Sequence, residues 1–226
     1  MVNLWLFDID GTLINVNGLH LIAYKEAYKN VLCLDVPDEI ILNTFGMPQK
    51  ESQQIILSKM DNNSIDKIDN VLEQYQNIFL KLTKDQGINP LPGVINILEQ
   101  LSNSGDVVGV VSGNMENRAK MILLNSGLLN YFEVLSFDNG GDGGRELIVK
   151  KAIDQAQKNN PIKKIIVFGD TPMDIIAGKK NGCFTVGLLT GNNNLDELQK
   201  ENPSLLLESL ENYQEVINLV KSKLKE

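Results

Sequence analysis

The stretch Phe7-Asp8-Ile9-Asp10-Gly11-Thr12-Leu13 decides the fold of this chain. It follows the apolar run Leu4-Trp5-Leu6-Phe7, which is short and does not alternate with polar residues. Such a run is typical of a strand buried on both faces, as in a parallel sheet covered by helices. Two carboxylates two residues apart then fall at the carboxyl end of that strand, where open α/β sheets bind their ligands.

Three more apolar runs of this kind occur at residues 107–111, 165–168 and 185–188. Helical spacing of apolar residues lies between them, for example in residues 94–101 after the breaker Pro92-Gly93 and in residues 148–156. Strand and helix alternate, which favours an α/β fold with right-handed crossovers. We therefore expect a Rossmann-like parallel-sheet core with helices on both faces.

Residues 16–83 interrupt this alternation, because they show helical patterns and no convincing buried strand. In the clearest of these patterns one apolar face persists over five turns, through Ile65, Ile68, Val71, Leu72, Tyr75, Ile78, Phe79 and Leu82. We expect residues 16–83 to form an inserted helical domain, and residues 1–15 and 84–226 to form the core.

Composition excludes several classes of protein. The chain has 226 residues and a net charge of −8, so it lacks the basic footprint that nucleic-acid binding requires. The sequence contains no apolar run of 18 residues, so we expect neither a membrane segment nor secretion, and the chain is predicted to be cytoplasmic. Cys33 and Cys183 show no metal-binding spacing, and both are predicted to be small core residues.

Two further polar clusters follow the predicted strands. Ser112-Gly113-Asn114 comes after residues 107–111 and is predicted to open a helix that carries Met115, where a hydroxyl and free N–H groups would cradle an anion. An ordinary helix N-cap explains this cluster equally well. Gly169-Asp170-Thr171-Pro172-Met173-Asp174 comes after residues 165–168, and its two carboxylates suit Mg²⁺.

These clusters are weak signals separately and a stronger one together. Asp8 and Asp10 could be solvated turn residues, and Asp174 could simply favour a helix N-terminus. However, all three clusters follow buried parallel strands, so they would meet at one edge of the sheet. Carboxylates, a hydroxyl and an anion cradle in one place favour metal-assisted phosphoryl transfer with a carboxylate nucleophile.

The three motifs, in this order and spacing, resemble the haloacid dehalogenase superfamily of phosphohydrolases. The resemblance covers nearly the whole chain. Within the superfamily, the chain is most similar to phosphoglycolate-phosphatase-type members. It implies a Rossmann-like core with a helical cap inserted after the first motif, in agreement with the predicted insertion at residues 16–83. Because Asp10 is present, the resemblance also points to phosphate chemistry rather than dehalogenation.

The resemblance also implies the catalytic roles. Asp8 would attack phosphorus, and Asp10 would protonate the leaving oxygen and later activate water. The family's basic residue, usually a lysine, would correspond to Arg145, with Lys150 as the alternative. A surface position at a helix N-terminus is the competing interpretation of Arg145.

The remaining roles concern binding. The phosphoryl oxygens would be held by Ser112 and by the backbone around Gly113 and Asn114. The resemblance implies Mg²⁺ as the cofactor, bound by Asp8, the carbonyl of Asp10, and Asp170, with Asp174 in or beside that set.

Residues in the predicted cap are harder to interpret. His20 falls where related caps have a hinge histidine, but it could equally be a partly buried surface residue. Gly46 and Gln49 are candidates for substrate specificity, and a plain turn role is the alternative. The segment Gly46-Met47-Pro48-Gln49 lacks the arginine of the sugar phosphomutase branch, which weakens that reading.

The predicted activity is Mg²⁺-dependent hydrolysis of small phosphorylated metabolites, with phosphoglycolate as the leading substrate. A sugar phosphomutase and a non-catalytic phosphometabolite-binding protein are the alternatives. We expect a monomer or weak homodimer whose partner is a small phosphorylated metabolite.

Overall fold

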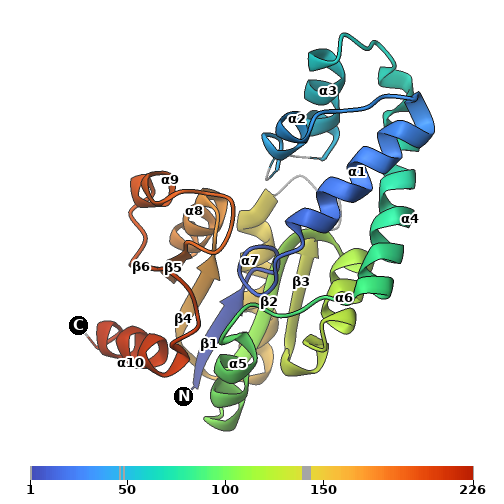
Figure 1. Ribbon diagram of the computed structural model, residues 1–226. Helices are drawn as coiled ribbons and strands as arrows, with labels where there is room; N and C mark the ends of the chain where they lie inside the picture. Colours follow the sequence, from blue (N-terminus) through green and yellow to red (C-terminus); the bar gives the residue numbers. More distant parts are fainter. Residues whose placement is uncertain (1, 46, 48, 139–143, 226) are drawn as a thin grey trace. The chain divides into compact units, whose positions relative to one another are not determined.

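The computed structural model describes residues 2–45, 47, 49–138 and 144–225. Its centre is a sheet of six parallel strands in the order β3-β2-β1-β4-β5-β6 (Figure 1). The strands are β1 (Val2–Phe7), β2 (Val107–Met115), β3 (Val134–Asp138), β4 (Ile162–Gly169), β5 (Phe184–Leu188) and β6 (Leu205–Leu207). The strand order reverses beside β1, so the carboxyl ends of β1, β2 and β4 meet where such sheets bind ligands.

Helices cover both faces of this sheet, as predicted. Helices α5 (Val94–Asn103), α6 (Glu116–Asn125) and α10 (Tyr213–Lys223) belong to one face. Helices α7 (Gly144–Asn159) and α8 (Pro172–Lys180) pack together on the other, with α9 (Leu195–Lys200) connecting β5 to β6. The short 3-10 helix η2 (Leu129–Tyr131) precedes β3. The Rossmann-like parallel core is confirmed.

Strand β1 shows why the core is apolar on both sides. Leu4 and Leu6 belong to the buried cluster that includes the apolar face of α7. Trp5 and Phe7 alternate with them, and both rings stack on Phe168 of β4, at centroid distances of 5.9 and 4.7 Å. A central strand with bulky residues on both faces has no side that could tolerate solvent.

The chain divides into two compact units, residues 1–15 with 89–226 and residues 16–88. The second unit is helical, with α1 (Asn17–Leu32), α2 (Asp38–Leu42), α3 (Gln49–Lys59), η1 (Ile65–Lys67) and α4 (Ile68–Gln86). Helix α4 buries Ile68, Val71, Leu72, Tyr75 and Phe79 and packs against α1. None of the helices that the structure describes has the length and apolar character needed to cross a bilayer.

Several local predictions were wrong. Ser112, Gly113 and Asn114 do not open a helix, because β2 continues to Met115 and α6 begins at Glu116. Ile65 does not join the buried face of α4, since it lies in η1 and is 58% exposed.

Strands β3 and β6 were not predicted, because the polar Ser136 interrupts the apolar run of β3 and because β6 has three residues. They lie at the two outer ends of the sheet order. Cys183 is buried as expected, whereas Cys33 is exposed. Cys33 has a left-handed backbone (φ 56°) just after α1 ends, which takes it off the packed part of the helix.

Candidate active site

Asp8 follows the last residue of β1 and is fixed there by the sheet. Its backbone N–H donates to the carbonyl of Phe168 on β4, at 2.9 Å. A tight turn follows, in which the Gly11 N–H donates to the Ile14 carbonyl at 2.7 Å and Gly11 has a φ of +81°. This left-handed conformation suits glycine, so the glycine of the Asp-x-Asp-Gly pattern forms the turn that follows the two carboxylates.

Asp170 follows the end of β4, and Asp174 is in the first turn of α8. Thr171 caps that helix, accepting a hydrogen bond from the Asp174 N–H while its own hydroxyl donates to Asp174 Oδ2 at 2.6 Å. Pro172 occupies the first turn, where its missing N–H costs nothing. The capping box therefore points the Asp174 carboxylate back towards the end of β4.

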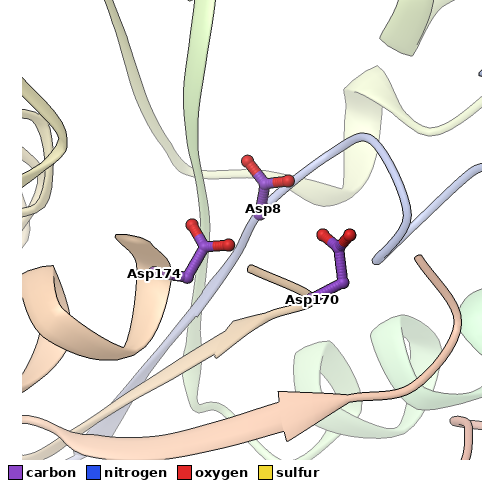
Figure 2. Close-up of side chains that lie close together, drawn as sticks. All are labelled: Asp8, Asp170 and Asp174. Atoms are coloured by element: carbon purple, nitrogen blue, oxygen red, sulfur yellow. The ribbon is translucent and has the colours of Figure 1, made fainter. Parts of the chain in front are cut away.

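The three carboxylates of Asp8, Asp170 and Asp174 converge (Figure 2). One oxygen from each lies within 4.8 Å of the others, and each residue is at least 96% buried. Thr12 adds a hydroxyl at 3.4 Å from Asp170 Oδ1. These three residues, expected from two separate motifs, thus come together at the carboxyl edge of the sheet.

Arg145, in the first turn of α7, lies against this cluster. Its Nη1 donates to Asp8 Oδ1 at 2.6 Å, and its Nε is 3.2 Å from Asp174 Oδ1. Lys150 is elsewhere, in an exposed ion pair with Asp154 on the surface of α7. The structure thus places Arg145, and not Lys150, at the site.

Electrostatics at the cluster are dominated by burial and mutual repulsion. Burial raises the pKa of the Asp8 carboxyl to about 8, with Asp174 and Asp10 acting in the same direction and Arg145 opposing them. Burial, followed by the charges of Asp8 and Asp174, also raises the pKa of Asp170 well above its usual range. For Arg145, burial favours loss of the proton, but Asp174 and Asp8 outweigh it and raise the pKa of the guanidinium. Three carboxylates against one guanidinium leave an excess of negative charge.

This excess is what a divalent cation would offset. The donor set is three buried carboxylates, whose hard oxygen atoms suit Mg²⁺, Ca²⁺ and Mn²⁺. The residues present therefore fit a magnesium ion at the centre of the cluster.

The second predicted cluster lies beside these carboxylates, at the end of β2. Ser112 is buried, Gly113 is exposed and Asn114 is half-buried. A Cβ placed on Gly113 would come within 3.9 Å of Arg145 Cζ, so this backbone passes close to the guanidinium. Asp10 does not join the three-carboxylate cluster, because its Oδ2 accepts a hydrogen bond from Asn114 Nδ2 at 2.6 Å.

The two candidates in the helical unit are placed within that unit alone. His20 is buried in α1, where its Nδ1 is 2.8 Å from the Tyr75 hydroxyl and its ring stacks on Phe79. His20 is therefore a buried residue of the helical unit and not a surface residue. Gln49 is half-buried and begins α3, whereas Gly46 lies outside the described residues.

Sequence reasoning missed a loop that supports Asp170. In residues 190–193, after β5, Thr190 Oγ1 donates to the Gly11 carbonyl at 2.5 Å, and Asn193 Nδ2 donates to the Asp170 carbonyl at 3.3 Å. Between them, Gly191 faces the Asp170 side chain so closely that a Cβ would lie 2.8 Å from Asp170 Cβ. The sequence did contain one signal for this loop: like the other site segments, residues 190–193 are polar and follow a predicted buried strand.

Comparison with known proteins agrees with this architecture. The family model described as haloacid dehalogenase-like hydrolase matches residues 5–188. A Clostridium perfringens protein provisionally named pyrophosphatase PpaX is 30% identical over 213 residues, which are 92% of this chain and 94% of that protein. The phosphoglycolate phosphatase of Aquifex aeolicus is 28% identical over 221 residues, 92% of this chain and 96% of its own.

Among solved structures, one from Thermotoga maritima provisionally named a β-phosphoglucomutase aligns with a TM-score of 0.75. It is 21% identical and covers 98% of this chain and 99% of its own, a likeness that shows the fold alone. The family model spans the three motifs that supply Asp8, Ser112, Asp170 and Asp174. On the combined evidence of sequence match, fold and site, the chain belongs to the haloacid dehalogenase-like hydrolase family.

Proposed function

We propose that this chain is a Mg²⁺-dependent phosphatase of small phosphorylated metabolites that works through an aspartyl phosphate on Asp8. The observation that carries the proposal is the buried Asp8 carboxylate, held by Arg145 at 2.6 Å inside a cluster with Asp170 and Asp174. A buried carboxylate with a cation on one oxygen is a suitable nucleophile for phosphorus, because the cation orients it and opposes the rise in pKa that burial causes.

The first half of the reaction transfers the phosphoryl group to the protein. An oxygen of Asp8 forms a bond to phosphorus, the bond from phosphorus to the leaving oxygen breaks, and Asp10 gives that oxygen its proton. In the second half, Asp10 takes a proton from water as the water oxygen attacks phosphorus. The bond between phosphorus and Asp8 then breaks, and inorganic phosphate leaves.

Binding in this proposal is shared between side chains and metal. The Ser112 hydroxyl and the backbone around Gly113 would hold phosphoryl oxygens, with Arg145 offsetting their charge. Mg²⁺ would be held by Asp8, Asp170 and the carbonyl of Asp10, with Asp174 in or beside that set. When bound, it would supply electrostatic stabilisation of the charge on the transferring group.

The substrate class is proposed from the relatives and from the unit 16–88. Phosphoglycolate is the first candidate and inorganic pyrophosphate the second, because the similar proteins carry those names. Residues 16–88 would act as a cap that excludes water during transfer and contacts the leaving group.

The test is phosphate release from a panel that includes phosphoglycolate, pyrophosphate and β-glucose 1-phosphate, with Mg²⁺ and with EDTA. The variant is Asp8→Asn, and the matched control is Asp154→Asn, whose carboxylate is half-exposed on α7. We expect turnover that needs Mg²⁺, is lost in Asp8→Asn and is unchanged in the control. Conversion of β-glucose 1-phosphate to glucose 6-phosphate without phosphate release would instead identify a mutase, and no reaction at all would favour a binding protein.

A further inference from the structure

Asn114 connects two residues to which the proposed reaction gives different roles. Its side-chain Nδ2 donates to Asp10 Oδ2 at 2.6 Å, and its backbone N–H donates to Ser112 Oγ at 3.2 Å. Asn114 is half-buried near the end of β2, and β2 is the parallel neighbour of β1, from which the Asp10 turn emerges. The bond to Asp10 therefore joins the ends of adjacent strands, whereas the bond to Ser112 lies within β2.

These bonds point the donors of Asn114 towards the protein. The backbone N–H that an anion cradle would use is committed to Ser112 Oγ. Because that oxygen accepts a hydrogen bond, the hydroxyl proton of Ser112 is left to donate elsewhere. Asn114 thus orients the Ser112 hydroxyl and does not offer this N–H to a phosphoryl oxygen.

The side-chain bond has a similar consequence for Asp10. A carboxyl group that transfers a proton must use one oxygen as hydroxyl and the other as acceptor. The Asn114 amide donates to Oδ2, and this bond sets the direction of the Asp10 carboxyl group. The backbone of the turn is held separately by the N–H groups of Gly11 and Leu13, whereas Asn114 contacts the Asp10 carboxylate itself.

We propose that Asn114 is a positioning residue that holds the Asp10 carboxyl for proton transfer to the leaving oxygen, and not a ligand of the phosphoryl group. The proposal rests on the proposed function of the site. The step it controls moves one proton from Asp10 to the leaving oxygen as the bond between that oxygen and phosphorus breaks.

The leaving group provides the test. An alkyl phosphate such as phosphoglycolate expels a poor leaving group that needs the proton, whereas p-nitrophenyl phosphate expels an acidic phenol that does not. The value of kcat/KM reports the steps up to the first phosphoryl transfer, so it isolates the leaving-group step from later hydrolysis of the aspartyl phosphate. Asn114→Ala is the variant, because it removes Nδ2 and keeps the backbone N–H that bonds Ser112.

For Asn114→Ala we expect kcat/KM for phosphoglycolate to fall by about 10²-fold and that for p-nitrophenyl phosphate by less than about threefold. Inhibition by inorganic phosphate should not change, since the phosphoryl ligands remain. The matched control is Asn62→Ala, which removes a half-buried asparagine side chain that bonds the Ser64 N–H in the helical unit, and it should affect both substrates equally little.

Two results would overturn the inference while the proposed function stands. One is an equal fall for both substrates together with weaker phosphate inhibition, which would make Asn114 a phosphate ligand. The other is wild-type kcat/KM for both substrates in the variant. A wild-type protein that hydrolyses neither of these substrates nor any other member of the panel would instead refute the proposed function, and the inference with it.

Discussion

Substitution of Gly191 by alanine should weaken the metal site without replacing any proposed ligand. A Cβ at residue 191 would lie 2.5 Å from Asp170 Cγ and 2.8 Å from Asp170 Cβ, and closer still to Oδ2. Cβ atoms essentially never come within 3.0 Å of another heavy atom, and ordinary contact begins near 3.4 Å. To bring the distance between this Cβ and Asp170 Cγ from 2.5 Å to 3.4 Å, the Asp170 side chain or the loop must move by about 1 Å. The closer Oδ2 atom makes this a minimum.

A displacement of that size is large for both metal binding and catalysis. Ligand distances in metal sites are held to within about 0.2 Å. A misplacement of about 1 Å at a reacting group can cost about 10²-fold in rate. We expect Gly191→Ala to weaken Mg²⁺ binding by roughly 10–100-fold, the range seen when groups that orient a ligand are lost, and to lower kcat/KM by about 10²-fold.

The assay is the increase in Tm as Mg²⁺ is titrated, measured beside kcat/KM for the best substrate. Gly18→Ala is the control, because a Cβ there meets nothing within 4 Å. The Tm without metal and the far-UV spectrum establish that each variant is folded. A folded Gly191→Ala protein with wild-type Mg²⁺ response and wild-type kcat/KM would refute the reasoning that this glycine makes room for Asp170.

Three other predictions follow from particular contacts. Arg145→Lys should lower kcat/KM by about tenfold and Arg145→Met by about 10²–10³-fold, since one ammonium cannot serve Asp8 and Asp174 as the guanidinium does; normal steady-state kinetics in either variant would contradict this. Asp106→Ala should lower the free energy of unfolding, measured by urea titration, by roughly 2–4 kcal/mol, because the Asn3 backbone N–H and the Trp5 indole N–H would lose their acceptor. The value of kcat/KM should not change. At about pH 8, iodoacetamide should label exposed Cys33 and spare Cys183, whose pKa burial raises to about 12, so that its reactive thiolate is scarce; mass spectrometry of the native protein showing Cys183 modified first would contradict this.

The carboxylates of the site could be predicted because one rule of topology brings them together. Asp8 and Asp170 each follow a buried parallel strand, and the carboxyl ends of such strands share an edge. Asp174 was predictable from the spacing of a helix start marked by Pro172. Arg145 was reached through the family resemblance, since nothing in its own surroundings distinguishes it from a surface arginine.

What remained beyond the sequence depends on side-chain direction and on close packing. The spacing of residues 112–114 predicts a polar cluster after a strand, but not that β2 runs on to Met115 or that the Asn114 amide turns to Asp10. Gly191, in the loop after β5, lies against Asp170 at the end of the neighbouring strand β4, and a lone glycine in a polar loop carries no sign of such a contact. Cys33 is apolar enough for the core, yet α1 ends one residue before it.

The most direct test of the central claim is whether phosphorus becomes bonded to Asp8. The protein is mixed with substrate and Mg²⁺, quenched in acid within the first turnovers, digested and analysed by mass spectrometry. We expect the peptide that contains Asp8 to carry one phosphoryl group, and the same peptide from Asp8→Asn to carry none. Phosphate release at the wild-type rate with no phosphoryl group on Asp8, or undiminished turnover in Asp8→Asn, would contradict the account.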